Sequence, residues 1–300
     1  MDDKTQVKEI LKEFLKRSVT TSDDLHLVKA CERNATLSQD IFAQVSDFVK
    51  GSGDDLKVAR IFSELAAFMG RTVYMHMSPA HQRYIALYTA CAAYIDDAGS
   101  RHIEALAEFS RRFATGEKHL CPALEVLAGL LRQSYDLWPK AGADAIICST
   151  LMGITALHLE CTTNTMAITP QATLWPNYVR ERTGAAAAYA HFNFMKEWRS
   201  TPDSYMQILP YIEFFINGCN DVLSFYKEEL CGETANYVHI RAVTDELTPV
   251  DTLRRLADET LACQEKIRVL IGEDRELMAI WRSFEQVRDR TIHESERHAY

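Results

Sequence analysis

Residues that interrupt helices are scarce in this chain, which has only 12 glycines and 8 prolines among 300 residues. The sequence also lacks the alternation of apolar and polar residues, bounded by turn dipeptides, that is typical of strands. Leucine, alanine, glutamate and arginine, which favour helices, are plentiful. These features argue against a sheet-based fold and predict an all-α domain of about ten helices.

No apolar run reaches the roughly 18 residues that a membrane-spanning helix needs. The first residues, Met1-Asp2-Asp3-Lys4, are acidic and are not followed by the apolar region of a signal peptide. The net charge of −9 disfavours a nucleic-acid partner, whose phosphates require Lys and Arg contacts. We therefore expect a cytoplasmic protein, monomer or homodimer, with no membrane span and no nucleic acid bound.

Cysteines are present but never spaced as C-x-x-C, so the sequence indicates no zinc site and no redox motif. In a chain of this length, scattered cysteines are typical of reduced thiols rather than of a disulfide framework. We expect most of them to be small core residues: Cys31, Cys91, Cys121, Cys148, Cys161, Cys219, Cys231 and Cys263.

The chain shows no linker and no repeat, so residues 1–300 are expected to form one domain, with peripheral helices in 1–60 and the functional motifs in 94–300. Helix starts are predicted at Ser78-Pro79, Thr201-Pro202 and Thr248-Pro249, where a capping hydroxyl precedes a proline.

The helical segments divide into two kinds by their hydrophobic pattern. Amphipathic segments predict outer helices at Val19–Ala30, Gln39–Val49 and Asp55–Met69. Apolar segments predict inner helices at Tyr84–Ile95, Ala145–Leu159, Ala185–Phe194 and Ile208–Ile216. Such an inner layer could pack solidly or surround a cavity, and the pattern alone favours solid packing.

One predicted helix face between residues 220 and 228 is rich in oxygen atoms. In a helix, Asn220, Ser224 and Glu228 fall at i, i+4 and i+8 and so share a face. An amide oxygen, a hydroxyl and a carboxylate suit a hard divalent cation such as Mg²⁺. Lys227 precedes the last of them, where it could reach a bound phosphate. Spacing alone leaves an ordinary polar helix face equally open.

Asp96-Asp97 differs from the other Asp-Asp pairs of the chain because it ends a predicted helix. The pairs at residues 23–24 and 54–55 stand where helices are expected to begin, and there the helix dipole favours acidic residues. At a helix C-terminus the dipole disfavours them, and adjacent carboxylates repel each other. A bound cation would relieve both costs, so Asp96-Asp97 is a candidate metal site rather than a solvated pair.

Two acidic helix ends could together hold a diphosphate through Mg²⁺ at the mouth of an apolar cavity. Cationic side chains would complete such a site, and arginine suits phosphate because its guanidinium binds bidentately. The candidate cations are Arg180, Arg182, Lys227 and Arg297.

These residues resemble the class I terpene synthases, and in particular the fungal trichodiene synthase group. Residues 220–228, Asn-Asp-Val-Leu-Ser-Phe-Tyr-Lys-Glu, match the family's N-D-x-x-S-x-x-K-E metal motif at every specified position, and Tyr94-Ile95-Asp96-Asp97 is similar to its aspartate-rich motif. The resemblance covers residues 60–300. It implies a single-domain helical bundle around a central apolar cavity. It also implies a Mg²⁺-dependent sesquiterpene synthase, which ionises farnesyl diphosphate and cyclises the carbocation to a hydrocarbon or an alcohol.

The resemblance assigns metal ligands to both motifs. Asp96 or Asp97 would bind one or two of three expected Mg²⁺ ions, with the first aspartate as the principal ligand. Asn220, Ser224 and Glu228 would bind a third. Mn²⁺ is a possible substitute.

The resemblance also assigns residues to the diphosphate group. Arg180 is similar to the family's diphosphate-sensing arginine, with Thr183 and Gly184 at the linker and effector positions three and four residues later. Arg182 lacks this spacing and is the second choice.

The C-terminal residues and one motif position depart from the family pattern. Arg297 resembles the arginine of an Arg-Tyr pair that binds diphosphate together with Lys227, but His298 follows it and the nearest tyrosine is Tyr300. Ser100 stands where the aspartate-rich motif usually has a third acid.

Other functions stay open beside a sesquiterpene synthase. A chain-elongating prenyl diphosphate synthase would have a second aspartate-rich motif in place of 220–228, and a non-catalytic helical relative would explain the departures. The D-x-D-D motif is missing, which argues against protonation-initiated cyclisation.

Aromatic rings can stabilise migrating cations. Core packing is nevertheless the better interpretation for each candidate: Tyr74, Tyr84, Tyr88, Tyr94, Phe192, Phe194, Phe214, Phe215 and Trp281.

Overall fold

The computed structural model describes residues 3–18, 35–52, 56–163, 165–199 and 201–285, and within them the chain forms helices and turns without strands. The all-α prediction is therefore confirmed. The α-helices are α1 (Asp3–Ser18), α3 (Ala35–Ser52), α4 (Leu56–Phe68), α5 (Pro79–Ala98), α6 (Ile103–Thr115), α7 (Pro122–Leu137), α8 (Lys140–Thr163), α9 (Trp175–Thr183), α10 (Ala186–His191), α11 (Leu209–Cys231), α12 (Tyr237–Asp245), α13 (Pro249–Ile271) and α14 (Arg275–Glu285). Short helical turns are η2 (Met69–Val73), η3 (Gly99–Arg101), η4 (Pro202–Ser204) and η5 (Met206–Ile208).

Two of the three predicted helix starts are confirmed. The Ser78 hydroxyl accepts a hydrogen bond from the His81 amide at the start of α5, and Thr248 accepts one from the Asp251 amide, 3.1 Å away, at the start of α13. The prediction at Thr201 is wrong. Its side chain makes no capping bond, and two short turns, η4 and η5, follow it instead of a long helix. The long helix α11 begins later, at Leu209.

Most predicted segments fall inside observed helices: Gln39–Val49 in α3, Tyr84–Ile95 in α5 and Ala145–Leu159 in α8. The predicted helix over Ala185–Phe194 is shortened at both ends to α10: Ala185 takes a left-handed conformation with φ of 46°, and the chain continues as turns after His191. The predicted helix Val19–Ala30 lies outside the described residues.

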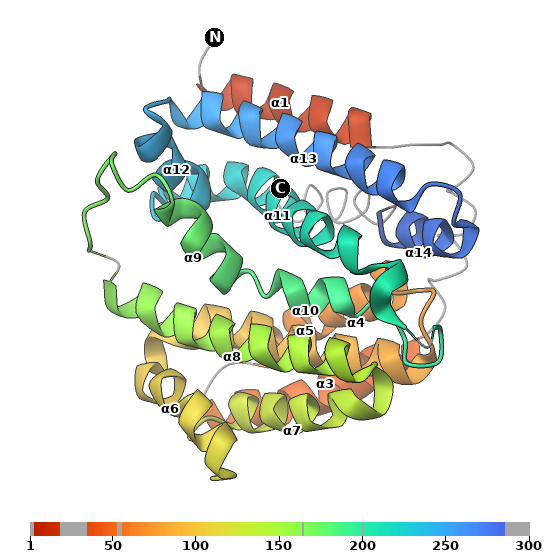
Figure 1. Cartoon of the computed structure of the whole chain (residues 1–300). Helices are drawn as coiled ribbons and strands as arrows, with labels where there is room; N and C mark the ends of the chain where they lie inside the picture. Colours follow the sequence, from red (N-terminus) through yellow and green to blue (C-terminus); the bar gives the residue numbers. More distant parts are fainter. Residues whose placement is uncertain (1–2, 19–34, 53–55, 164, 200, 286–300) are drawn as a thin grey trace.

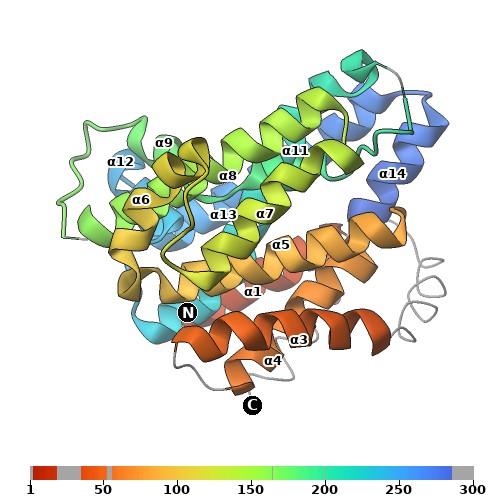
Figure 2. The same ribbon diagram turned by 90° about the horizontal axis from the view of Figure 1, so that it is seen from below.

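The helices pack in layers that place α9 and α11 near the middle of the molecule (Figure 1). Helix α8 packs against α6, α7, α9 and α10, and α11 packs against α10 and α13. On the opposite side, α3 and α4 pack together and α4 packs on α5 (Figure 2). The long helices α5, α8 and α11 thus bring residues from distant parts of the sequence into one bundle.

The main core contains the aromatic side chains of the inner helices. The ring of Phe192 lies 5.1 Å from Tyr88, 5.9 Å from Tyr84 and 6.1 Å from Tyr74, measured between centroids. Of the nine aromatic candidates, eight are buried in this core, and only Phe214, at 37% exposure, is not. Core packing therefore accounts for those eight rings. The central apolar cavity stays a prediction.

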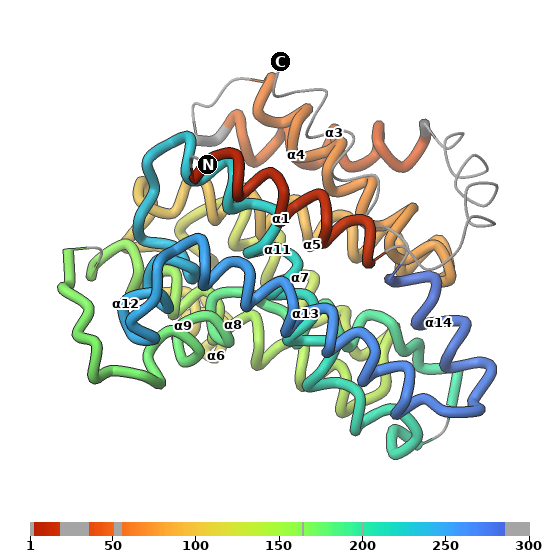
Figure 3. Tube along the Cα trace, turned by 90° about the horizontal axis from the view of Figure 1, so that it is seen from above, coloured from red at the N-terminus to blue at the C-terminus, as the bar shows by residue number. Residues whose placement is uncertain are grey.

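A second, smaller core lies behind α11. Helix α1 runs alongside α13 (Figure 3), and Phe14 of α1 belongs to a buried cluster that includes Val222 and Phe225 of α11. Gly218 lets α11 approach α13 closely, because a Cβ there would overlap the Thr260 hydroxyl. The motif helix is therefore supported by α1 and α13 on the face away from its metal motif.

Helix α8 is long and apolar enough to cross a membrane when judged by length and composition alone. In the structure it packs against four neighbouring helices, so its apolar residues have a role in the fold. The seven cysteines within the described residues are free thiols, as the sequence predicts, and Cys31 lies outside that part of the chain. Of these seven, only Cys91, Cys121 and Cys263 are buried, so the prediction that most are core residues is wrong.

Candidate active site

The site centres on the end of α9, where the chain bends sharply into α10. Helix α9 ends at Gly184, and Ala185 adopts the left-handed conformation before α10 begins. Gly184 itself has an ordinary helical φ of −73°. It is needed for space instead, because a Cβ there would overlap Asn217 Oδ1 and lie 2.9 Å from Arg180 Nη1. Helix α11 and the break after α9 are therefore in close contact.

Arg180 joins α9 to the metal motif on α11. Its Nε donates to Asp221 Oδ2 over 2.8 Å, and its Nη2 donates to Asn220 Oδ1 over 3.0 Å. Arg182, by contrast, stacks on the ring of Tyr178 at 3.5 Å and donates to the main-chain oxygen of that residue. The structure thus places Arg180 in the candidate site and turns Arg182 back onto its own helix.

The ion pair between Arg180 and Asp221 is largely shielded from solvent, with 16% and 11% of the two side chains exposed. Burial raises the pKa of Asp221 to about 6, and the nearby Glu228 carboxylate adds to the rise, whereas Arg180 opposes it. Arg180 therefore stabilises the ionised form of Asp221, which burial disfavours.

Asp96, near the end of α5, interacts electrostatically with the same guanidinium. Burial raises the pKa of Asp96, Arg180 lowers it, and the adjacent Asp97 raises it again. Asp96 nevertheless keeps an exposed side chain. Arg180 therefore interacts electrostatically with both predicted metal motifs.

Glu160 is a further carboxylate of this region that the sequence did not single out. It lies near the end of α8, and its pKa is raised to about 7, mainly by burial and then by Asp96. Arg180 opposes this rise as well. The only sequence signal was a lone acid near the end of an otherwise apolar helix, a pattern that also occurs on solvated surfaces.

The motif helix presents its predicted ligands as expected from their spacing. Residues 220–228 are continuous α-helix within α11, with Asn220 exposed and both Ser224 and Glu228 half-buried. Within the described residues, the side chains of Ser224 and Glu228 make no hydrogen bond and no ion pair with the protein, whereas the Glu228 main-chain oxygen accepts from the Glu233 amide. Lys227 is exposed on the same helix.

Several predicted site residues contribute less, or lie outside the described part of the chain. The Thr183 hydroxyl donates to the Val179 main-chain oxygen over 3.2 Å, within its own helix. Ser100 lies in the turn η3 and is exposed. Arg297 and Tyr300 fall beyond residue 285, where the described structure ends.

The donor atoms of the site fit a magnesium ion in chemical type. In the described residues, no three His, Cys, Asp or Glu side chains gather closely enough to form a metal centre by themselves. The predicted set instead combines carboxylate, amide and hydroxyl oxygens, which Mg²⁺ prefers together with water. Asn220 Oδ1 already accepts from a cationic group, which shows that this oxygen is directed towards positive charge.

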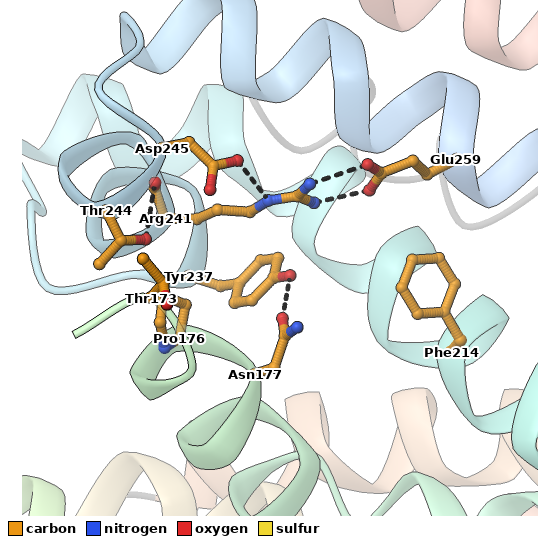
Figure 4. Close-up of a pocket in the computed structure, with 9 residues that line it drawn as sticks. All are labelled: Thr173, Pro176, Asn177, Phe214, Tyr237, Arg241, Thr244, Asp245 and Glu259. Atoms are coloured by element: carbon orange, nitrogen blue, oxygen red, sulfur yellow. Dashed lines mark hydrogen bonds and ion pairs between the residues drawn. The ribbon is translucent and has the colours of Figure 1, made fainter. Parts of the chain in front are cut away.

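A polar cavity of about 300 Å³ lies beside this site, between α9, α11, α12 and α13 (Figure 4). In it, Arg241 forms bidentate bonds of 2.6 and 2.8 Å with Glu259, and Tyr237 donates to Asn177 over 2.7 Å. None of the predicted metal ligands lines this cavity. Its polar groups are paired with one another, so they stabilise the contact between α12, α13 and α9.

Solved structures identify the fold. The linalool/nerolidol synthase of Streptomyces clavuligerus, solved alone and with 2-fluorogeranyl diphosphate, superposes with TM-scores of 0.62 and 0.59. Each alignment covers 84% of this chain, at 16% sequence identity. The alignments cover 94% of the chain solved alone and 90% of the chain solved with the diphosphate. The fold is that of the class I terpene synthases.

Relatives at the sequence level are fungal enzymes. Alpha-cuprenene synthase COP6 of Coprinopsis cinerea is 29% identical over 94% of this chain and 85% of its own length. Monoterpene synthase 25 of Postia placenta is 30% identical over 90% of this chain and 78% of its own. Longiborneol synthase CLM1 of Gibberella zeae is 30% identical over 82% of this chain and 75% of its own length.

The fold and these relatives define a class I terpene cyclase, a lyase that acts on prenyl diphosphates. The model of the trichodiene synthase (TRI5) family matches residues 55–290, and the chain belongs to this family. The family predicted from the sequence motifs is therefore confirmed.

Proposed function

We propose that this protein is a Mg²⁺-dependent sesquiterpene synthase that ionises farnesyl diphosphate, releases diphosphate and cyclises the resulting carbocation. The observation that best supports this proposal is the place of Arg180. It bonds to Asn220 and Asp221 of one motif and interacts electrostatically with Asp96 of the other. A diphosphate held between the two motifs would meet this guanidinium.

The proposed roles of the chain's own residues follow from their chemistry. Asp96, Asp97, Asn220, Ser224 and Glu228 would hold up to three Mg²⁺ ions, or Mn²⁺ in their place. Metal bound there would act as a Lewis acid and neutralise charge on the departing diphosphate.

Binding of the diphosphate itself would fall to the basic side chains. Arg180 offers a planar guanidinium with donors on two edges, and Lys227 offers an exposed ammonium group. We include Arg297 and Tyr300 in this set on the family pattern alone. Thr183 and Gly184 would fix the bend that brings Arg180 to α11.

The hydrocarbon chain requires surroundings that exclude water, because water would quench an allylic cation. The apolar helices α5, α8, α10 and α11 surround the acidic end of the site with buried side chains. We propose that the prenyl chain enters between them when the diphosphate is bound.

A pyrophosphate-release assay tests this function. Purified protein is incubated with farnesyl diphosphate and Mg²⁺, with a parallel sample in EDTA. The proposal predicts release that depends on Mg²⁺ and recovers with Mn²⁺. Release that is equal in EDTA would contradict the metal assignment, and no release with either metal would support a non-catalytic relative.

Geranyl diphosphate is the second candidate substrate, because one relative is named a monoterpene synthase. The same assay with geranyl diphosphate distinguishes the two by comparing kcat/KM. A higher value for geranyl diphosphate would replace the sesquiterpene assignment with a monoterpene one.

A further inference from the structure

Asn217 is a buried amide that the proposed mechanism has not used. It lies on α11 one turn before Asn220, and 8% of its surface is exposed. Its Oδ1 atom has no hydrogen-bond partner. Leaving a buried acceptor unpaired costs roughly 1–3 kcal/mol, so such an atom calls for an explanation.

The surroundings of Asn217 connect it to Arg180 in two ways. Its main-chain oxygen accepts a bond of 3.5 Å from Arg180 Nη2. Its Oδ1 and Arg180 Nη1 both lie within 3 Å of the point where a Cβ on Gly184 would stand. Arg180 uses Nε and Nη2 for its bonds to α11, and Nη1 donates to no described residue. A free donor and a free acceptor therefore face the same small space.

The bond between Arg180 and Asn220 conflicts with metal binding. Asn220 Oδ1 is the oxygen that the proposed function assigns to Mg²⁺, and in this structure it accepts from Nη2. A guanidinium and a divalent cation at one oxygen would repel each other. Arg180 Nη2 must therefore leave Asn220 Oδ1 when a cation binds at that oxygen, and a nearby acceptor on the protein would hold the guanidinium in its shifted position.

We propose that Asn217 is a positioning residue for Arg180, and that its Oδ1 is the acceptor to which Nη1 turns when Asn220 is released to a cation. This inference rests on the proposed function. Asn217 then holds the guanidinium in place for the diphosphate, and Gly184 supplies the space that this contact needs.

Titration calorimetry with inorganic pyrophosphate and Mg²⁺ tests the proposal without turnover. Asn217→Leu keeps the size of the side chain but removes the acceptor, and Asn217→Asp keeps an acceptor. Losing a hydrogen bond to a charged group should weaken pyrophosphate binding by about tenfold or more in the leucine variant. The aspartate variant should stay within about threefold of wild type, since it can still accept from Nη1.

A second pair of variants separates positioning from packing. Gly184→Ala should lower both the melting temperature and the pyrophosphate affinity, because the new Cβ displaces Asn217 and Arg180. Adding Asn217→Ala removes the larger overlap and leaves the 2.9 Å contact with Arg180 Nη1, so the melting temperature should recover in part while the affinity does not. Gly153→Ala is the matched control, since a Cβ there meets the Arg182 main-chain oxygen at an ordinary 3.5 Å.

The outcomes distinguish this inference from the proposed function on which it rests. If wild-type protein neither binds pyrophosphate with Mg²⁺ nor turns over a prenyl diphosphate, the proposed function fails. If wild type does both and Asn217→Leu binds pyrophosphate equally well, the positioning role is overturned. Recovery of affinity in the Gly184→Ala, Asn217→Ala double variant would also overturn it.

Discussion

Arg180 and Asp221 form an ion pair between α9 and α11, with Nε donating to Oδ2 over 2.8 Å. Both side chains are largely buried, and α9 bends into α10 only four residues after Arg180. The pair therefore fixes the place where the helix break meets the motif helix. It also keeps a guanidinium beside Asn220 in the protein without ligand.

Replacing Arg180 by methionine should destabilise the fold by about 3 kcal/mol, because it leaves a buried carboxylate without its cation. The pKa of Asp221, already raised to about 6, should rise further. A carboxyl whose pKa is higher in the folded state lowers the stability of the protein as pH rises above the pKa of the unfolded state. The stability lost through Arg180→Met should therefore be larger at pH 8 than at pH 5. Denaturant unfolding at both pH values measures this.

Arg182→Met is the matched control for that experiment. Within the described residues, the Arg182 guanidinium interacts with Tyr178 of its own helix and forms no ion pair, so its replacement should change stability by less than about 1 kcal/mol at either pH. Equal losses in the two variants would show that the ion pair with Asp221 has no special role.

Asp97→Ala and Asn220→Ala should each abolish turnover of farnesyl diphosphate with Mg²⁺ and leave the helical circular dichroism spectrum unchanged. Each removes an oxygen ligand from the proposed metal site. Asp136→Ala, at an exposed position on α7, is the control and should keep wild-type activity. Full activity in either site variant would refute the metal assignment for that residue.

Phe14→Ala should cost about 3–5 kcal/mol, because it leaves a cavity in the core shared by α1, α11 and α13. The motif helix loses support in the same step, so Mg²⁺-dependent pyrophosphate binding should weaken too. Lys12→Ala, on the exposed face of α1, should have neither effect. A loss below 1 kcal/mol in Phe14→Ala, by urea unfolding, would mean that α1 contributes little to the motif helix.

Glu160 should make stability depend on pH in the absence of metal. Its pKa rises from 4.5 to about 7 on folding, so the folded state binds the extra proton between these values and stability falls as pH increases through them. Relative to Glu160→Gln, wild type should lose about 1 kcal/mol between pH 4.5 and 7.5, a value reduced by solvent screening at this accessible side chain. Parallel unfolding curves at all pH values would contradict the raised pKa of Glu160 in the folded protein.

Local sequence patterns predicted the helices well but not the contacts between them. Ser78 and Thr248 cap helices because capping depends on residues only three positions apart. Thr201 has the same signal and fails, since only the short turns η4 and η5 follow it, and α11 starts at Leu209 with a proline in its own first turn.

The same limit applies to the site. Spacing made Asn220, Ser224 and Glu228 candidate ligands on one helix face, and an unfavourable helix position made Asp96-Asp97 a candidate pair. Glu160 and Asn217 gave no comparable signal, because their importance comes from neighbours on other helices. The choice between Arg180 and Arg182 was likewise decided by which guanidinium reaches α11.

The most direct test of the central claim is product analysis by gas chromatography and mass spectrometry. Purified protein is incubated with Mg²⁺ and geranyl, farnesyl or geranylgeranyl diphosphate, with and without isopentenyl diphosphate. The account predicts that farnesyl diphosphate yields a cyclic sesquiterpene hydrocarbon or alcohol together with free diphosphate. A longer prenyl diphosphate formed with isopentenyl diphosphate, or no volatile product from any of the three substrates, would contradict it.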